Sequence, residues 1–175
     1  MLYEPAVVFI QEINIAGALQ VFSHHFQVYV NMEPRAQFTD GLGIVTIVRH
    51  DIKVWESIIG SEGRILGIKV SNVQLWHVYP FLRSAYKKER EIFVRETLNN
   101  YMMLWKDSTQ YLVQGGDHNC THRLIDSLNN QAEKYQYGLV KHLNVHCLKD
   151  DFLAVHGENE VCYSRITARS KTRID

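Results

Sequence analysis

The sequence predicts an α/β or α+β fold in which helices cover β-sheet. Short apolar or alternating segments bounded by turn residues fill most of the first 80 residues, which is the pattern of consecutive strands. After residue 80 the hydrophobic spacing becomes helical in two longer segments. With 175 residues, of which 46% are hydrophobic and 22% charged, the chain has a globular composition and a length suited to one domain, 1–175.

Consecutive strands are predicted in the first half of the chain. Their segments are 5–13, 26–32, 41–50, 54–60, 64–70 and 73–80. The first, PAVVFIQEI, has the apolar run of a buried strand and ends near Glu12. Ser71 and Asn72 suit a tight turn between the last two strands, and Pro80 ends the last one.

Two helices are predicted in the second half, over 84–106 and 133–148, although Gly138 weakens the second. The first carries an apolar stripe at near-helical spacing, formed by Phe93, Thr97, Tyr101, Met102 and Trp105. Such a stripe indicates core contact rather than a cofactor site. Further strands are predicted, the last two as a hairpin, in the segments 110–116, 161–166 and 171–175.

Charge gives no general argument for a polyanionic partner, because the net charge is zero and the pI is about 7.1. Binding of nucleic acid would need a local basic patch. The run formed by Arg83, Lys87, Lys88 and Arg90 is either such a patch or the solvated face of a helix.

The cysteines and the N-terminus predict an intracellular protein, in the nucleus or the cytoplasm. The chain has an odd number of cysteines without tight spacing, namely Cys120, Cys147 and Cys162, so a disulfide framework is not expected. The N-terminal segment lacks the basic residues of a signal peptide, and no apolar run is long enough to span a membrane. We therefore expect neither secretion nor a membrane partner, and the sequence does not indicate an oligomeric state.

Polar side chains lie at or just beyond the ends of several predicted strands, where rigid scaffolds usually place functional groups. They are Glu12, Tyr79, Asp117, Asn119 and Asp175. Cleavage of a phosphodiester requires a divalent cation, a group that positions the attacking water, and donors that stabilise charge on the phosphoryl oxygens. The side chains at these strand ends are of the types that this reaction needs.

Each of these groups has a role that its chemistry allows. Glu12 offers the hard oxygen that magnesium prefers, and Asp117 can orient or deprotonate a water. The amide of Asn119 can donate to a phosphate oxygen, while Gly115 and Gly116 allow close approach of the backbone. The alternative is that the segment GGDHN is only a turn that ends a strand.

The order of the motifs resembles the endonuclease/exonuclease/phosphatase superfamily over nearly the whole chain. The matching segments are IQE (10–12), HVYP (77–80), GGDHN (115–119) and TRID (172–175). The chain looks most like the endonuclease domain of non-LTR (LINE-type) retrotransposons. The reasons are its short loops, the passage KKEREIFVRE (87–96), and a threonine three residues before the last aspartate.

This resemblance implies a fold and an activity. The fold is a four-layered α/β sandwich of two packed mixed β-sheets flanked by helices, with terminal strands missing. The activity is nicking of DNA with Mg²⁺, or Mn²⁺, and without a small-molecule cofactor. The nick would leave a 3′-hydroxyl that can prime reverse transcription.

The resemblance also implies roles for individual residues. Glu12 matches the metal ligand, and Tyr79 matches the tyrosine that contacts the scissile phosphate. Asp117 and Asn119 match the pair that orients the water and the phosphate, and Asp175 matches the aspartate that supports a catalytic histidine. Further candidates for substrate contact, with weaker alignment, are His77, His118, Ser164 and Thr172.

The chain departs from the family pattern in several places. His118 stands where the family usually has phenylalanine or tyrosine, and His77 where asparagine is frequent. The family's first strand carries an asparagine near the metal and its last carries Ser-Asp-His, and neither motif occurs between Met1 and Asp175. Weak or absent activity is therefore expected. An inactive remnant and another phosphoesterase of the superfamily remain as alternatives.

A zinc site is a further alternative for the same region. His118, Cys120 and His122 alternate, so an extended segment would place them on one face. Only three ligands are visible, and the segment also has to carry the Asp-Asn pair. We interpret the alternation as coincidence.

Overall fold

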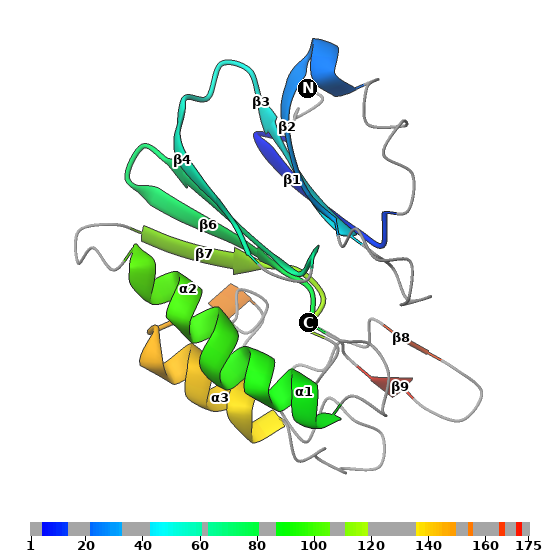
Figure 1. Cartoon of the computed structure of the whole chain (residues 1–175), viewed down its shortest axis with the longest axis vertical. Helices are drawn as coiled ribbons and strands as arrows, with labels where there is room; N and C mark the ends of the chain where they lie inside the picture. Colours follow the sequence, from blue (N-terminus) through cyan, green and yellow to red (C-terminus); the bar gives the residue numbers. More distant parts are fainter. Residues whose placement is uncertain are drawn as a thin grey trace. The chain divides into compact units, whose positions relative to one another are not determined.

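The computed structural model describes residues 5–13, 22–32, 43–60, 63–80, 87–105, 111–118, 136–149, 154–155, 165–166 and 171–172. The chain divides into two compact units (Figure 1). Unit 1 comprises Met1–Tyr79 and Asp107–Gly116, and unit 2 comprises Pro80–Lys106 and Asp117–Asp175.

Unit 1 contains two β-sheets. Their strands are β1 (Val7–Gln11), β2 (Phe26–Met32), β3 (Gly43–Arg49), β4 (Val54–Ile59), β5 (Ile65–Val70), β6 (Val73–Val78) and β7 (Tyr111–Gly115). The first sheet has the order β1-β3-β2 and is antiparallel. The second has the order β4-β5-β6-β7, and its last pair is parallel. The predicted strands of this region therefore form, although only the second sheet is mixed among the strands described.

The two sheets pack against each other, because β2 and β3 both contact β5 and β3 also contacts β6. Strand residues point alternately to opposite faces, so the register defines which side chains lie between the sheets. One row across β1, β3 and β2 is Phe9, Thr46 and Tyr29, and the next is Gln11, Ile44 and Asn31. Both rows face the second sheet, since members of each contact its residues.

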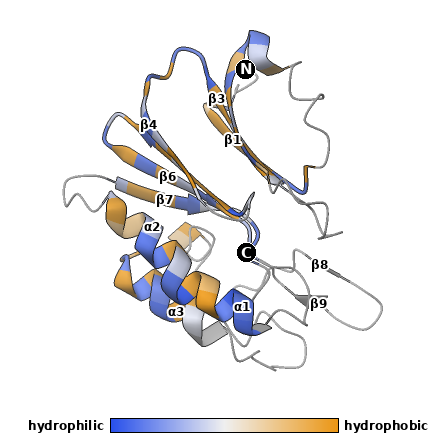
Figure 2. Ribbon diagram, in the orientation of Figure 1, coloured by the Kyte–Doolittle hydropathy of each residue, from blue (hydrophilic) through white to orange (hydrophobic). Residues whose placement is uncertain are grey.

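The first sheet is apolar on its other face as well. Val45 and Ile47 are buried there, and half-buried hydrophobic side chains pack around them. They are Val8, Ile10, Ile13, Phe26, Val28 and Val30. In the second sheet, β5 and β6 bury consecutive residues, so both faces of these strands are covered. Figure 2 shows the resulting hydrophobic runs along the strands.

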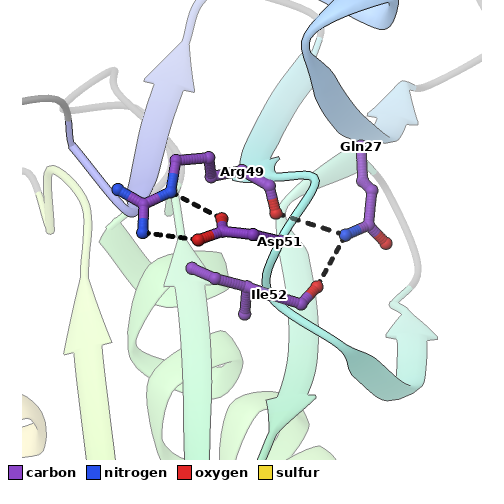
Figure 3. A network of polar contacts seen from close by, with 4 residues as sticks. All are labelled: Gln27, Arg49, Asp51 and Ile52. Carbon is purple, nitrogen blue, oxygen red and sulfur yellow. Dashed lines mark hydrogen bonds and ion pairs between the residues drawn. The ribbon is translucent and has the colours of Figure 1, made fainter.

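The β3–β4 connection is held by side chains rather than by strand pairing (Figure 3). The Gln27 amide donates to the carbonyl oxygens of Ile52, at 2.7 Å, and Arg49, at 3.3 Å. Arg49 also forms two hydrogen bonds with Asp51, and these lower the pKa of the Asp51 carboxyl. The Arg49 carbonyl also accepts from the Ile52 N–H at 3.0 Å, so one amide of β2 adds two hydrogen bonds to a turn that the backbone already closes.

Unit 2 contains the helices that the sequence predicts. The first is continuous through α1 (Lys87–Ile92), a π-helical segment η4 (Phe93–Leu98) and α2 (Asn99–Leu104). Its predicted stripe is confirmed as core contact, because Phe93, Met102 and Trp105 are buried. In the basic run, Lys88 is exposed but Arg90 is buried, so the run is not a uniformly solvated face.

Among its described residues, unit 2 also contains α3 (Gln136–Val145) and a hairpin of β8 (Arg165–Ile166) and β9 (Lys171–Thr172). The helix α3 packs on η4, and Leu139 is buried against Leu143. Both predictions, the second helix and the final hairpin, are confirmed.

None of the helices among the described residues is long and apolar enough to cross a membrane. Cys147 is an exposed free thiol, and Cys120 and Cys162 lie outside the described residues. The compartment stays a prediction from the sequence.

Replacement of Gly138 by alanine should stabilise the protein. Within the part of the chain that the structure describes, a Cβ atom at this position in α3 would meet Glu91 Cγ alone, at 3.8 Å, which is an ordinary contact. Alanine also has less conformational entropy to lose, so the free energy of unfolding in urea should rise by about 0.5–1 kcal/mol.

The matched control is Gly115→Ala at the end of β7. Its Cβ would lie 2.6 Å from Phe9 Cε2, so the ring would have to move, and stability should fall by about 1–3 kcal/mol. Equal changes at the two glycines would contradict this description of their surroundings.

Candidate functional site

Glu12 and Tyr79, which belong to two of the predicted motifs, are in direct contact. The Tyr79 hydroxyl donates to Glu12 Oε1 at 2.7 Å, across 67 positions of the chain. The Tyr79 side chain is 1% exposed, whereas Glu12 is exposed. The pair therefore consists of a phenol fixed in the core and a carboxylate that a cation in solvent can reach.

The strand β6 explains the direction of Tyr79. His77 and Tyr79 are two residues apart, and both side chains contact the first sheet. Just beyond the strand, the Tyr79 N–H donates to the Arg64 carbonyl at 2.9 Å, and Arg64 Nη1 donates to the Tyr79 carbonyl at 3.3 Å. Arg64 was not predicted as a site residue, because a charged residue before an apolar strand is usually solvated.

Glu12 has a left-handed backbone conformation, with a φ of 58°. A side chain in this region costs about 1–2 kcal/mol, so the conformation needs support from its surroundings. That support comes from Tyr79 and from the preceding residue, since Gln11 Nε2 donates to the Val78 carbonyl at 3.3 Å. Strand β1 therefore ends at Gln11, and the Glu12 side chain does not follow the alternating directions of the strand residues.

The glycines at the end of β7 are required by packing inside unit 1. A Cβ on Gly115 would clash with the Phe9 ring. Gly116 has a φ of +129°, and a Cβ there would lie 2.0 Å from the Val78 carbonyl oxygen and 2.7 Å from Gln11 Nε2. The close approach expected of these glycines is thus made to the protein's own backbone and side chains.

Asp117 is the next residue of the chain and is half-buried within unit 2. Thr172 lies in β9, where the structure describes the backbone. Asn119, Ser164 and Asp175 lie outside the described residues. Convergence of these residues with Glu12 and Tyr79 stays a prediction.

The structure places His77 in the core between the sheets. It is 0% exposed, its ring stacks on Phe9 with centroids 4.7 Å apart, and its Nδ1 lies 3.2 Å from Thr46 Oγ1. Burial lowers the pKa of His77 to about 3, so the ring is neutral. Its contacts are with the two sheets rather than with solvent.

His118 belongs to a group of histidines within unit 2. It is buried, as is His142, whose pKa is lowered to about 3 by burial and further by His146 and His118. The rings of His142 and His146 lie 4.8 Å apart, and His146 Nε2 is 2.9 Å from Asn99 Oδ1. His118 therefore places an imidazole among other buried or half-buried histidines of unit 2.

Glu12 is the predicted metal ligand, and its exposed carboxylate fits a cation of the magnesium type. Magnesium usually takes one or two carboxylates and keeps several waters. Among the described residues, no group of three or more His, Cys, Asp or Glu is arranged to hold a metal ion. The zinc alternative is not tested, because Cys120 and His122 lie outside the described residues.

No protein-family model matches the sequence, and no curated protein matches it. The fold, however, is similar to solved structures. An AP endonuclease from Archaeoglobus fulgidus matches with a TM-score of 0.70 at 17% identity, over 94% of this chain and 69% of that one. The 3′ phosphatase NExo from Neisseria, bound to a product DNA hairpin, matches with a TM-score of 0.68 at 18% identity, over 94% of this chain and 69% of that one. TDP2 from C. elegans matches with a TM-score of 0.61 at 12% identity, over 98% of this chain and 53% of that one.

At these identities the likeness shows the fold alone. It is the α/β fold with two packed β-sheets that the resemblance predicts, so the predicted fold class is confirmed. The chain spans 69% of the length of the AP endonuclease and about half, 53%, of TDP2.

Glycine should be more stable than alanine at position 12. Both Glu12→Gly and Glu12→Ala remove the hydrogen bond with Tyr79, but only glycine adopts a φ of 58° without strain. The unfolding free energies in urea should differ by about 1 kcal/mol in favour of glycine. An alanine variant that matches or exceeds the glycine variant would contradict the left-handed conformation.

His77 should make the protein less stable in acid. Its pKa is about 3 in the folded protein and 6.5 in the unfolded chain, so below about pH 6.5 only the unfolded chain takes up the proton. Stability should therefore fall as the pH drops from 6.5 towards 3, by about 1.4 kcal/mol per pH unit from this residue.

Urea unfolding of wild type and His77→Gln at several pH values measures this slope. The variant should lose stability less steeply, whatever its absolute stability at neutral pH. His142 contributes in the same direction, because its pKa is also lowered to about 3. Identical slopes in wild type and His77→Gln would rule out a neutral buried imidazole at this position.

Proposed function

We propose that this chain is a metal-dependent phosphodiesterase domain that nicks DNA, of the type found in the endonucleases of non-LTR retrotransposons. The observation that carries the proposal is the 2.7 Å hydrogen bond from Tyr79 to Glu12. It joins the predicted phosphate contact to the predicted metal ligand, although the two motifs lie far apart in the sequence.

The solved structures support DNA as the substrate. An AP endonuclease and a 3′ phosphatase bound to a product DNA hairpin share the fold of this chain. The order of the motifs favours an endonuclease within this fold. The hairpin β8–β9, which lies next to Ser164 and contains Thr172 in the sequence, is a candidate for contact with the DNA.

Glu12 and Tyr79 would act together on the phosphate. Glu12 would hold Mg²⁺, or Mn²⁺, with the carboxylate oxygen that does not accept from Tyr79. When bound, the cation supplies positive charge that offsets the charge on the phosphate and on the leaving oxygen. The Tyr79 hydroxyl carries one proton, so in the complex it would donate to a phosphoryl oxygen in place of Glu12 Oε1, and the burial of the ring fixes the direction of that donor.

The remaining roles fall to residues beyond β7. Asp117 would orient the attacking water and accept its proton. Asn119 would donate to a phosphoryl oxygen, and Asp175 would support a histidine donor, as the resemblance implies.

Incubation with supercoiled plasmid tests this proposal. Slow, Mg²⁺-dependent nicking is expected, with a 3′-hydroxyl that a DNA polymerase can extend. Asp117→Ala should lower the rate by about 10²–10⁴-fold, because it removes the group that handles the water.

Two controls separate this activity from contamination. Asp51→Asn changes an exposed carboxylate that is bonded to Arg49, and it should nick like wild type. Glu12→Gln should require more Mg²⁺ for the same rate. Nicking that is unchanged in Asp117→Ala, or absent from wild type at every Mg²⁺ and Mn²⁺ concentration, would refute the proposal.

A further inference from the structure

We propose that Arg64 is a positioning residue for Tyr79, and that Arg64 thereby determines whether the Tyr79 hydroxyl reaches Glu12. The structural part of this inference stands on contacts within unit 1. Its consequence for catalysis rests on the proposed function.

Arg64 and Tyr79 lie one step beyond a paired strand end. Ile65 and Val78 are register partners on β5 and β6, so Arg64 and Tyr79 would be the next pair. The Tyr79 N–H still donates to the Arg64 carbonyl, at 2.9 Å, but the regular pairing of the two strands has ended. Pairing with the neighbouring strand therefore holds the Tyr79 backbone through its N–H group, and not through its carbonyl group.

The Arg64 side chain supplies the second constraint. Its Nη1 donates to the Tyr79 carbonyl at 3.3 Å, and its guanidinium carbon lies 5.7 Å from the centre of the Tyr79 ring. The two residues are therefore joined through backbone, carbonyl and ring. A cation at this distance from a tyrosine ring is within the range of an attractive contact.

Arg64 is an unusual choice for a purely structural position. It is only 6% exposed, and a buried guanidinium is costly unless its donors are used. An apolar side chain would fill such a site at lower cost. Holding the carbonyl and the ring of Tyr79 together needs a planar, multiply donating cation, which arginine provides.

The backbone of Arg64 is itself held firmly. The carbonyl of the next residue, Ile65, accepts hydrogen bonds from Asn31 Nδ2, at 2.7 Å, and from the Gly60 N–H, at 2.9 Å. Asn31 is buried in β2 of the facing sheet. Arg64 therefore connects a rigid contact between the sheets to the tyrosine of the site.

This connection would fix the position of the Tyr79 hydroxyl. The hydrogen bond from Tyr79 to Glu12 is 2.7 Å long, so a small rotation of the ring would break it. A shift of about 1 Å in a positioning group can lower a rate about 10²-fold. Arg64 would thus act on the phosphate only through Tyr79.

A mutant cycle measures this dependence without requiring activity. Tyr79→Phe, Glu12→Gln and the double variant give the coupling between the two side chains in the unfolding equilibrium constant. We expect a coupling of about fivefold with Arg64 present, the usual size for one hydrogen bond. In the Arg64→Met background the coupling should disappear.

Two further backgrounds distinguish positioning from loss of structure. Arg64→Lys keeps a cation and a donor, so it should restore part of the coupling. If Arg64→Met does not fold, the cycle is measured in Arg64→Lys instead. Arg49→Met removes an exposed arginine of unit 1 that is bonded to Asp51, so the fivefold coupling should persist. Coupling that survives in both Arg64 variants at its full size would overturn the inference.

Plasmid nicking provides the second readout. Arg64→Met should lower kcat about tenfold and leave KM unchanged, because the tyrosine is misdirected while the DNA contacts remain; an unchanged kcat would refute the catalytic part of the inference. Absence of nicking by wild type would refute the proposed function, whereas the mutant cycle would still decide the role of Arg64.

Discussion

Two amide side chains, one buried and one half-buried, tie the sheets of unit 1 together, and the geometry of the candidate site depends on them. Gln11 and Asn31 flank Ile44 in one row of the first sheet. They donate to the carbonyl oxygens of Val78 and Ile65, which are partners in the facing sheet. Buried carbonyl groups need such donors. The two hydrogen bonds therefore hold the start of β5 to β2 and the end of β6 to β1, at a pair of register partners. Glu12 and Tyr79 begin one residue beyond these ties.

The site thus follows from where regular structure ends. Strand β1 stops at Gln11, and Glu12 turns into a left-handed conformation that an alternating strand would not provide. Strand β6 stops at Val78, and Tyr79 keeps the direction of the strand without its full pairing. Each strand delivers one functional group in a direction that its last paired residue determines. A local rearrangement at either strand end would separate the carboxylate from the phenol.

Sequence reasoning predicted the strands well, because alternation and turn residues are local signals. It could not predict Arg64, since the partner of this residue is reached only through strand pairing. The conformation of Glu12 was also out of reach, because nothing in the neighbouring residues calls for a positive φ. For His77 and His118, residue type indicated substrate contact, and the structure shows that both side chains are buried. Long-range contacts decide these cases, and single-sequence patterns do not contain them.

The glycine pair at the end of β7 has a consequence for how such domains change over evolutionary time. Gly115 and Gly116 are held by the Phe9 ring and the Val78 carbonyl, so selection for folding alone would retain them. A descendant that had lost its chemistry could replace Glu12, and a glycine at this position would relax the backbone. The glycines of this motif therefore record ancestry, whereas the charged residues around them record activity. Enzymes and their inactive descendants should be told apart by the carboxylates and not by the glycines.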